Sequence, residues 1–250
     1  MQVSLDLHIH SDYSSDGILS LEEIVAGCRK AGLQGCAVCD HERVLTDKVD
    51  LPDDFLLIPG VEIATRYGHL LGLFVSQPIE TTDFEQAAKA IHAQGGLTVM
   101  AHPFAHNIPD RELESAVPLL DGLEVQNSRV EWKNRKANRR AAAFAQKHGL
   151  FPHAGSDAHV YEELGGGRIT LEVEQLTAEA VKAALLEGQG KIWGQRTKAW
   201  CIARSQYTKR KKLQVHFGYY VQWFIFAVKC VLQDLLYRGG TYHVPDCKSR

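Results

Sequence analysis

The chain has 250 residues, of which 45% are hydrophobic and 23% are charged. These values are typical of a soluble globular protein that is long enough for one large α/β domain. Residues 1–6 run directly into a strand pattern and have neither a basic start nor a long apolar stretch, so we expect no secretory signal there. The six cysteines are scattered, which favours a reducing, cytoplasmic location over a disulfide-bonded secreted class.

Charge is distributed unevenly along the chain. The formal net charge is −2, but residues 1–190 carry −12 and residues 191–250 carry +10. An acidic body with a basic tail indicates either a tail that docks on an anionic surface or a tail that packs on the acidic body. Charge patterning alone leaves both interpretations open.

The predicted elements alternate between strands and helices. Residues 3–10 alternate apolar and polar side chains, which predicts a strand with its histidines on the polar face. The capping box Ser20–Glu23 begins a helix that Gly32 ends. Further strands are expected at 35–41, 55–62, 69–75, 97–102, 123–127, 151–157 and 168–171, with helices at 82–94, 130–148 and 177–187. This order predicts an α/β domain with mainly parallel strands, enough of them for a barrel.

The segment after residue 195 has a different composition. A basic run at 209–212 precedes an aromatic-rich stretch at 217–226, and polar residues such as Gln222 and Lys229 interrupt the apolar pattern. We therefore expect no transmembrane span. The tail is either an interfacial helix that contacts a membrane surface or a protein partner, or a helix folded onto the flank of the barrel. These observations divide the chain into a domain at 1–195 and a C-terminal extension at 196–250.

Residues of metal-ligand type lie at the ends of the expected strands. His8 and His10 leave the same face of one strand, so both imidazoles can bind one cation. Glu62 follows a buried strand and offers two oxygens that can bridge two ions. The other candidates at strand ends or in the loops beyond are Asp16, His41, His102, Asp157 and His159. Such convergence of polar groups is costly without a charge partner, and two or three divalent ions would supply one.

The motifs that contain these residues resemble those of the PHP family, named for polymerase and histidinol phosphatase domains. They are Asp6–Ser11, Cys39–His41, Ala101–Pro103 and Gly155–His159, and the resemblance covers roughly residues 1–190. It implies a distorted (β/α)7 barrel of PHP type, to which this chain adds a basic, aromatic-rich helical tail.

The resemblance also implies a site for three metal ions, with Mn, Fe and Zn all suited to a set of nitrogen and oxygen ligands. The implied ligands are His8, His10, Glu62 and Asp157 for the first ion; Glu62, His102 and a residue near Asn127 for the second; and Asp16, His41 and His159 for the third. Asn127 stands where some members carry histidine, which makes the second ion the more weakly held one.

The implied reaction is hydrolysis of a phosphate ester by a metal-activated hydroxide. Asp157 and His159 are the expected catalytic groups, with Asp40 placed to orient His41 or a metal-bound water. Arg129 and Arg168 are candidates for phosphate contacts, because the guanidinium fork fits phosphate. The alternative for each arginine is an ordinary surface position.

The expected substrates are a small phosphomonoester, a nucleotide or the end of an oligonucleotide. Histidinol phosphate is a further alternative, which the short separation of 40 residues between Glu62 and His102 disfavours. An interpretation from a different class is a weakly active or non-catalytic PHP module that its tail recruits to a partner or membrane. The complete set of charged ligands argues against lost catalysis.

Overall fold

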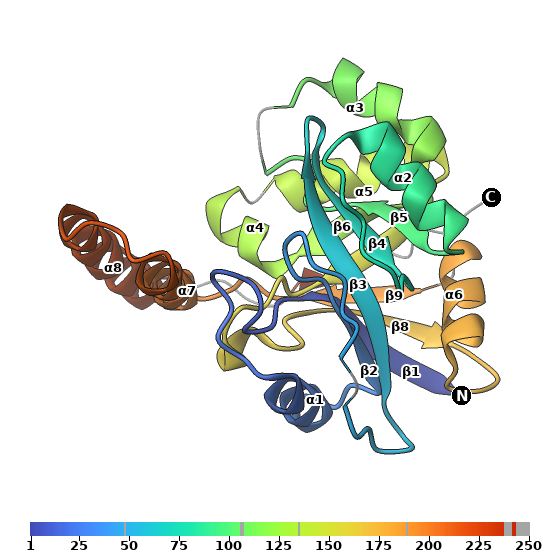
Figure 1. Ribbon diagram of the computed structural model, residues 1–250, viewed down its shortest axis with the longest axis horizontal. Helices are drawn as coiled ribbons and strands as arrows, with labels where there is room; N and C mark the ends of the chain where they lie inside the picture. The colour runs from blue at the N-terminus through green and yellow to red at the C-terminus, as the bar shows by residue number, and fades with distance from the viewer. Residues whose placement is uncertain (48, 106–107, 135, 189, 238–241, 244–250) are drawn as a thin grey trace.

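The structure is a computed structural model, which describes residues 1–47, 49–105, 108–134, 136–188, 190–237 and 242–243. Its strands are β1 (Gln2–Ile9), β2 (Gly35–Val38), β3 (Leu56–Thr65), β4 (Gly68–Leu73), β5 (Leu97–Met100), β6 (Gly122–Asn127), β7 (Phe151–Gly155), β8 (Gly167–Glu172), β9 (Lys191–Gly194) and β10 (Tyr242–His243). Within these residues they form one sheet in the order β10-β9-β8-β1-β2-β3-β4-β5-β6-β7 (Figure 1).

The sheet curls until β7 returns to β1. The backbone N–H of Asp157, just after β7, donates to the carbonyl oxygen of His8 at 2.8 Å. One residue further, Ala158 forms a parallel bridge with Ile9. The result is a nearly closed, barrel-like sheet, which confirms the predicted fold class and brings the ends of β1 and β7 together.

The strand directions are mixed rather than mainly parallel. β1, β2 and β3 are parallel to one another, and so are β5, β6 and β7. In contrast, β4 is antiparallel to both of its neighbours, and β8 is antiparallel to β1 and β9. Only Arg66 and Tyr67 separate β3 from β4, and a connection of two residues permits a hairpin but no parallel crossover.

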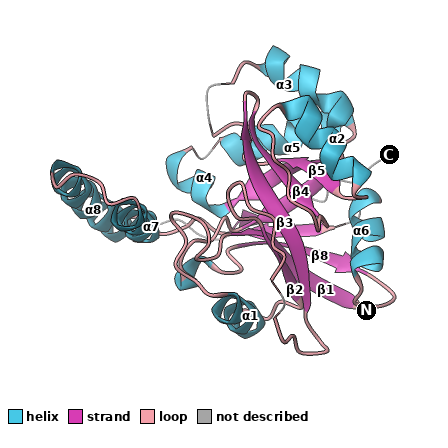
Figure 2. Cartoon of the chain, in the orientation of Figure 1, coloured by secondary structure: helices cyan, strands magenta, loops and turns pink. Residues whose placement is uncertain are grey.

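The described helices are α1 (Leu21–Lys30), α2 (Phe84–Ala93), α3 (Asp110–Ala116), α4 (Ser128–Lys133), α5 (Ala137–His148), α6 (Ala178–Leu186), α7 (Ala199–Lys212) and α8 (Gly218–Leu236), with short 3-10 turns at Val117–Leu119 and Tyr161–Glu163. The helices up to α6 lie around the sheet, whereas α7 and α8 project to one side (Figure 2). The expected capping box is present, since the Ser20 hydroxyl accepts from the N–H of Glu23 and the Glu23 carboxylate accepts from the N–H of Ser20.

The single helix expected over 130–148 is two helices. Asn134 separates α4 from α5 in an extended conformation, and its side-chain oxygen accepts from the N–H of Lys136 at 3.1 Å. Asparagine stabilises turns by bonding its own backbone two residues on, which explains the break. The short helix α3 and the strand β9 were not expected from the sequence pattern.

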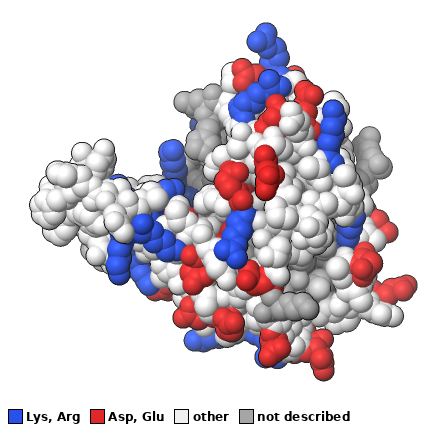
Figure 3. Space-filling view, in the orientation of Figure 1, with Lys and Arg blue, Asp and Glu red and all other residues white. Residues whose placement is uncertain are grey.

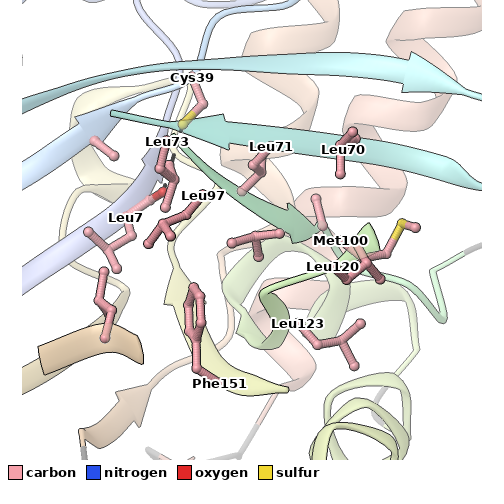
Figure 4. Packing of buried hydrophobic residues seen from close by; sticks show 14 of the residues in the cluster. Leu7, Cys39, Leu70, Leu71, Leu73, Leu97, Met100, Leu120, Leu123 and Phe151 are labelled. Atoms are coloured by element: carbon pink, nitrogen blue, oxygen red, sulfur yellow. Dashed lines mark hydrogen bonds between the residues drawn. The ribbon is translucent and has the colours of Figure 1, made fainter. Parts of the chain in front are cut away.

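The main hydrophobic core combines side chains from the strands with side chains from α2, α5 and α6. Leu7, Leu70 and Leu73 are fully buried in it, and Figure 4 shows them with neighbours from β5, β6 and β7. Burial of each such side chain is worth roughly 2 kcal/mol. Apolar side chains fill this core, and the polar side chains at the strand ends converge at the mouth of the barrel.

The tail folds as a pair of antiparallel helices. Trp223 of α8 donates from its indole nitrogen to the carbonyl oxygen of Ala203 at 2.7 Å. The Asp234 carboxylate accepts from the N–H groups of Ala199 and Trp200 at 2.8 and 2.9 Å, and so caps the start of α7. In Figure 1 the pair projects from the barrel as an arm. None of the described helices combines the length and apolar character needed to cross a membrane.

Candidate metal centre

Strand ends place the candidate ligands. β1 carries His8 and is followed by His10, β2 is followed by His41, and Glu62 lies on β3. The other predicted ligands follow their strands in the same way: Asp16 in the loop after β1, His102 after β5, and Asp157 and His159 after β7. The nearly closed sheet therefore gathers residues as far apart in sequence as His8 and His159.

The Glu62 carboxylate is the centre of the site and is 1% exposed. Its Oε2 lies 3.0 Å from Nδ1 of His41 and 3.2 Å from Nε2 of His10. Its Oε1 lies 2.7 Å from Nδ1 of His69 and 3.1 Å from Nε2 of His102. The two oxygens thus face two separate groups of histidines, which is the arrangement that a bridging carboxylate requires.

The histidines of β1 present their ring nitrogens to one point. Nε2 of His8 and Nε2 of His10 are 3.2 Å apart, and Oδ1 of Asp157 lies 4.0 and 3.4 Å from them. On the far side of each ring, Nδ1 faces an acceptor: a Glu124 oxygen at 3.0 Å for His8 and the Ser14 hydroxyl at 3.1 Å for His10. The Ser14 hydroxyl donates to Asp40, so it accepts from His10, and both rings turn their Nε2 atoms inward.

A third group lies on the other side of His10. Oδ1 of Asp16 is 3.3 Å from Nε2 of His159 and 3.5 Å from Nε2 of His41. This oxygen is buried without a hydrogen-bond partner. A buried carboxylate oxygen without a partner is costly, and a cation between the three side chains would remove that cost.

Three triads therefore meet the requirement for a metal ion. They are His8, His10 and Glu62; His10, His41 and His159; and Glu62, His69 and His102, each with ligand atoms within 4.8 Å of one another. The residues present fit divalent ions by donor type, by convergence and by the unpartnered Asp16 oxygen. The number and identity of the ions stay a prediction.

A cavity of about 400 Å³ opens above these triads. Its floor is formed by the ligands, and its walls combine the cations Arg129 and Lys209 with apolar side chains such as Val130 and Trp132. A cavity of this size admits a small organic molecule.

Two family profiles match this chain. The PHP domain profile matches residues 6–148, and the profile of a PHP-associated region matches residues 135–189. The chain belongs to the PHP family. The sequence resemblance is thereby confirmed, and both matches end before α7.

Three known proteins illustrate the relationship. An uncharacterized protein of Methanocaldococcus jannaschii is 30% identical over 178 residues, which are 67% of this chain and 70% of that protein. The 5'-3' exoribonuclease of Haemophilus influenzae is 30% identical over 131 residues, and the match covers 49% of this chain and 47% of the enzyme. A two-domain protein of Bacteroides vulgatus, described as containing a predicted PHP-like metal-dependent phosphoesterase, has a TM-score of 0.63 at 18% identity over 83% of this chain and 70% of its own.

The PHP site is strongly electronegative. Burial alone would lower the pKa of His8, but the Glu124, Asp157 and Glu62 carboxylates outweigh it and raise that pKa well above its usual value. Burial alone would raise the pKa values of Glu62 and Asp157, and the charge of His8 lowers both well below the usual range. The carboxylates therefore stay ionised at neutral pH and attract cations.

The pKa of His159 is shifted in the opposite direction from those of His8, His41 and His102. Burial, together with the positive charges of Arg129 and His10, lowers its pKa to about 4. Its Nδ1 lies 2.8 Å from the carbonyl oxygen of Asp157, which accepts a hydrogen bond from the ring. At neutral pH the Nε2 lone pair of His159 is therefore unprotonated and faces Asp16, as a metal ligand requires.

The sequence interpretation missed Glu124 and did not assign His69 to the site. Glu124 is fully buried on β6, where one oxygen accepts from His8 and the other accepts from the backbone N–H of His102 at 2.7 Å. Its signal in the sequence is a carboxylate between Leu123 and Val125 in an apolar strand. His69 reaches Glu62 from the antiparallel strand β4, so its position depends on the unexpected hairpin.

Asn127 does not fit the expected ligand role. Its Oδ1 accepts from the N–H of Val130 at 2.9 Å and caps α4. Because a backbone N–H can only donate, this contact fixes the amide orientation. The Nδ2 group then donates to Glu124 at 3.0 Å and to Asp157 at 3.2 Å. Asn127 holds two carboxylates in place, and His69 occupies the remaining place beside Glu62 and His102.

Asp40 acts on a different histidine from the one expected. Its carboxylate accepts from the Ser14 hydroxyl at 2.6 Å and from the N–H of Ser11 at 2.8 Å. It therefore fixes the loop after β1 and orients His10 through Ser14, rather than the ring of His41. Its role in positioning a water stays a prediction.

The two candidate arginines lie in different places. Arg129 lines the cavity, where its Nε donates to Glu163 at 2.9 Å and its Nη2 donates to the Ser205 hydroxyl at 2.6 Å. Arg168 donates to the carbonyl oxygen of Ala31 at 3.2 Å and stacks over the Trp193 ring at 4.0 Å. The structure brings Arg129 to the centre but not Arg168, so Arg168 does not fit the phosphate-binding role.

Proposed function

We propose that this PHP protein hydrolyses a phosphate ester in a metal-dependent reaction. The observation that carries the proposal is a set of three adjoining ligand triads, two of which share Glu62 and two of which share His10, at a cavity that Arg129 also lines. The family membership and the PHP-like structural neighbour support a metal-dependent hydrolase of this class.

The proposed centre binds two to three divalent ions, with Mn, Fe and Zn as the candidates. Bound ions would supply positive charge for the phosphoryl oxygens and for activation of water. Asp157 and His159 are the proposed catalytic groups at the cavity floor, since both line the cavity and contact the ligand set. Arg129 would stabilise charge on the phosphoryl group, because its planar guanidinium is held by Glu163 and Ser205 before any substrate arrives.

The proposed substrate is a small phosphomonoester, a nucleotide or the end of an oligonucleotide. The similarity to the Haemophilus exoribonuclease supports a nucleic-acid end, and the cavity of about 400 Å³ suits a substrate of one or two nucleotide units at most. Histidinol phosphate stays the second alternative. A reducing, cytoplasmic location is also part of this proposal, and the five described cysteines are all free.

The test combines metal content with turnover on the same sample. Protein purified without chelator is analysed by mass spectrometry and assayed on phosphomonoesters and phosphodiesters. We expect two to three ions per chain, and turnover that chelation and His10→Ala abolish. Absence of both metal and turnover after reconstitution with Mn, Fe or Zn would contradict the proposal.

The exposed apolar side of α8 favours a second candidate, a PHP module recruited by its tail. Phe224, Leu232 and Leu235 are 63%, 54% and 76% exposed, and exposed apolar patches often mark contacts with membranes or proteins. Flotation with anionic vesicles and the oligomeric state in solution test this candidate. A monomer at all concentrations that binds no vesicle would contradict it.

A further inference from the structure

Helix α7 lies outside both family profile matches, yet it forms one wall of the cavity. Its contributions are Ile202, Gln206 and Lys209. These residues follow one another at intervals of four and three positions, so they lie on one face of the helix. The wall is therefore a property of this chain's own tail rather than of the matched PHP region.

Polar contacts fasten α7 to the barrel on both sides of the metal centre. The Ser205 hydroxyl, fully buried, accepts from Arg129. The Lys212 ammonium donates to the carbonyl oxygens of Asp12, Ser14 and Gly17 at 2.6, 2.8 and 2.9 Å. These three carbonyls belong to the loop that carries Asp16, so the loop and the helix hold one another in place.

Lys209 has a different environment from Lys212. Its ammonium lies 3.3 Å from Oδ2 of Asp16, and its side chain is 40% exposed. Within the described part of the chain, Asp16 is the one hydrogen-bond partner of this ammonium. An ammonium has three donors, so two remain for a ligand in the cavity that Lys209 lines together with Arg129.

We propose that Lys209 is a substrate-binding residue that, with Arg129, holds the phosphoryl oxygens of the substrate. This inference rests on the proposed phosphoesterase function. Two fixed cations beside the metal centre favour a terminal phosphomonoester, which carries nearly two negative charges at neutral pH, over a diester with one. Lys209 thereby sets a preference for terminal phosphate groups through a segment that the family profiles do not include.

The experiment compares Lys209→Met with Lys211→Met, an exposed lysine two positions away on the same helix. Each metal-loaded protein is assayed for metal content, for the Kd of inorganic phosphate, and for KM and kcat on p-nitrophenyl phosphate and bis(p-nitrophenyl) phosphate. Loss of one charge-assisted hydrogen bond weakens binding roughly tenfold or more.

We expect Lys209→Met to raise the Kd of phosphate and the KM of the monoester roughly tenfold, with a smaller effect on the diester and unchanged metal content. Lys209→Arg should recover most of the loss, and Lys211→Met should behave as the wild type.

Equal values for the two methionine variants would overturn the inference while leaving the phosphoesterase intact. Loss of metal in Lys209→Met would also overturn it, because Lys209 would then act only through Asp16. A wild type that neither binds nor hydrolyses phosphate compounds would refute the proposed function itself, and this inference with it.

Discussion

The two tail helices follow one another in sequence, but α7 makes polar contacts with the barrel and α8 exposes apolar side chains. α7 directs Ser205, Lys209 and Lys212 at polar partners on the barrel. α8 leaves large apolar side chains such as Phe224 and Leu236 exposed, at 63% and 81%. Figure 3 shows the contrast: Lys and Arg gather where the arm meets the barrel, and the far part of the arm carries few charges on this face.

The two helices of one basic tail therefore have different environments. α7 belongs to the cavity, as the interpretation of a helix folded onto the barrel expected. The interpretation of α8 as a helix for an external surface stays a prediction. Its exposed apolar residues from Val221 onward follow helical spacing: Val221, Phe224, Ile225, Val228, Val231, Leu232, Leu235 and Leu236. The boundary near residue 195 stays a prediction, because α7 shares the cavity with the barrel.

The largest expected effect concerns the barrel interior, where acid should destabilise the protein through His153. Burial lowers the pKa of His153 to about 4, whereas an unfolded histidine titrates near 6.5. The unfolded chain therefore binds a proton between pH 6.5 and 4 that the folded chain does not. The contribution of His153 to the free energy of unfolding should be fully present above pH 6.5. The free energy of unfolding should then fall by roughly 3 kcal/mol as the pH decreases to 4.

Urea unfolding of metal-free wild type and His153→Gln at pH 7 and pH 4.5 measures this contribution. The variant should lose less stability between the two pH values than the wild type. An identical loss in both proteins would contradict the prediction.

The next largest effect is expected on metal affinity, which should depend on residues of the metal centre and not on those that contact the arm. Glu124→Gln keeps the shape of the side chain but removes the charge that orients His8, and loss of such a partner typically costs 10–100-fold in metal affinity. Competition with a fluorescent chelator measures the affinity. Glu162→Gln, at an exposed carboxylate that pairs with Arg204 of α7, is the control and should leave it unchanged.

A smaller effect tests the link between α7 and α8. Asp234→Ala removes the cap from the N-terminus of α7, which should lower the free energy of unfolding by about 1 kcal/mol. Because α7 carries Lys209, the KM for a phosphomonoester should also rise. Thermal unfolding and KM are measured on the same variant; a change in neither would show that α7 is held by the barrel alone.

The smallest effect is expected on the exposed side of α8. Phe224→Gln combined with Leu232→Gln should change the free energy of unfolding by less than about 0.5 kcal/mol per position, with kcat and KM unaltered. Thermal unfolding and turnover check this. A clear loss of stability would show that these side chains pack within the chain, and the contrast between α7 and α8 would then be wrong.

Local patterns in the sequence predicted the parts of the site that depend on one strand. The period-two spacing of His8 and His10 was enough to place both on one face. The role of His69 could not be derived in this way, because it requires the antiparallel register that sets His69 opposite Ala64. Asn127 could not be assigned either, since its oxygen caps α4 and only the pairing of β6 with β7 brings its nitrogen to Asp157.

Local sequence patterns could not predict the placement of α7 either. Its basic run at 209–212 indicates an anion-binding surface in general. Only the folded chain shows that Lys209 and Lys212 of this run contact the loop after β1.

The contact between Lys212 and that loop also bears on the order in which the protein is completed during synthesis. Lys212 and Asp12 are 200 positions apart, so the contact cannot form until residue 212 has left the ribosome. Closing so long a loop costs chain entropy before it is rewarded. The β1 strand, which is synthesised well before α7, therefore has no α7 wall on its cavity until that helix has been made.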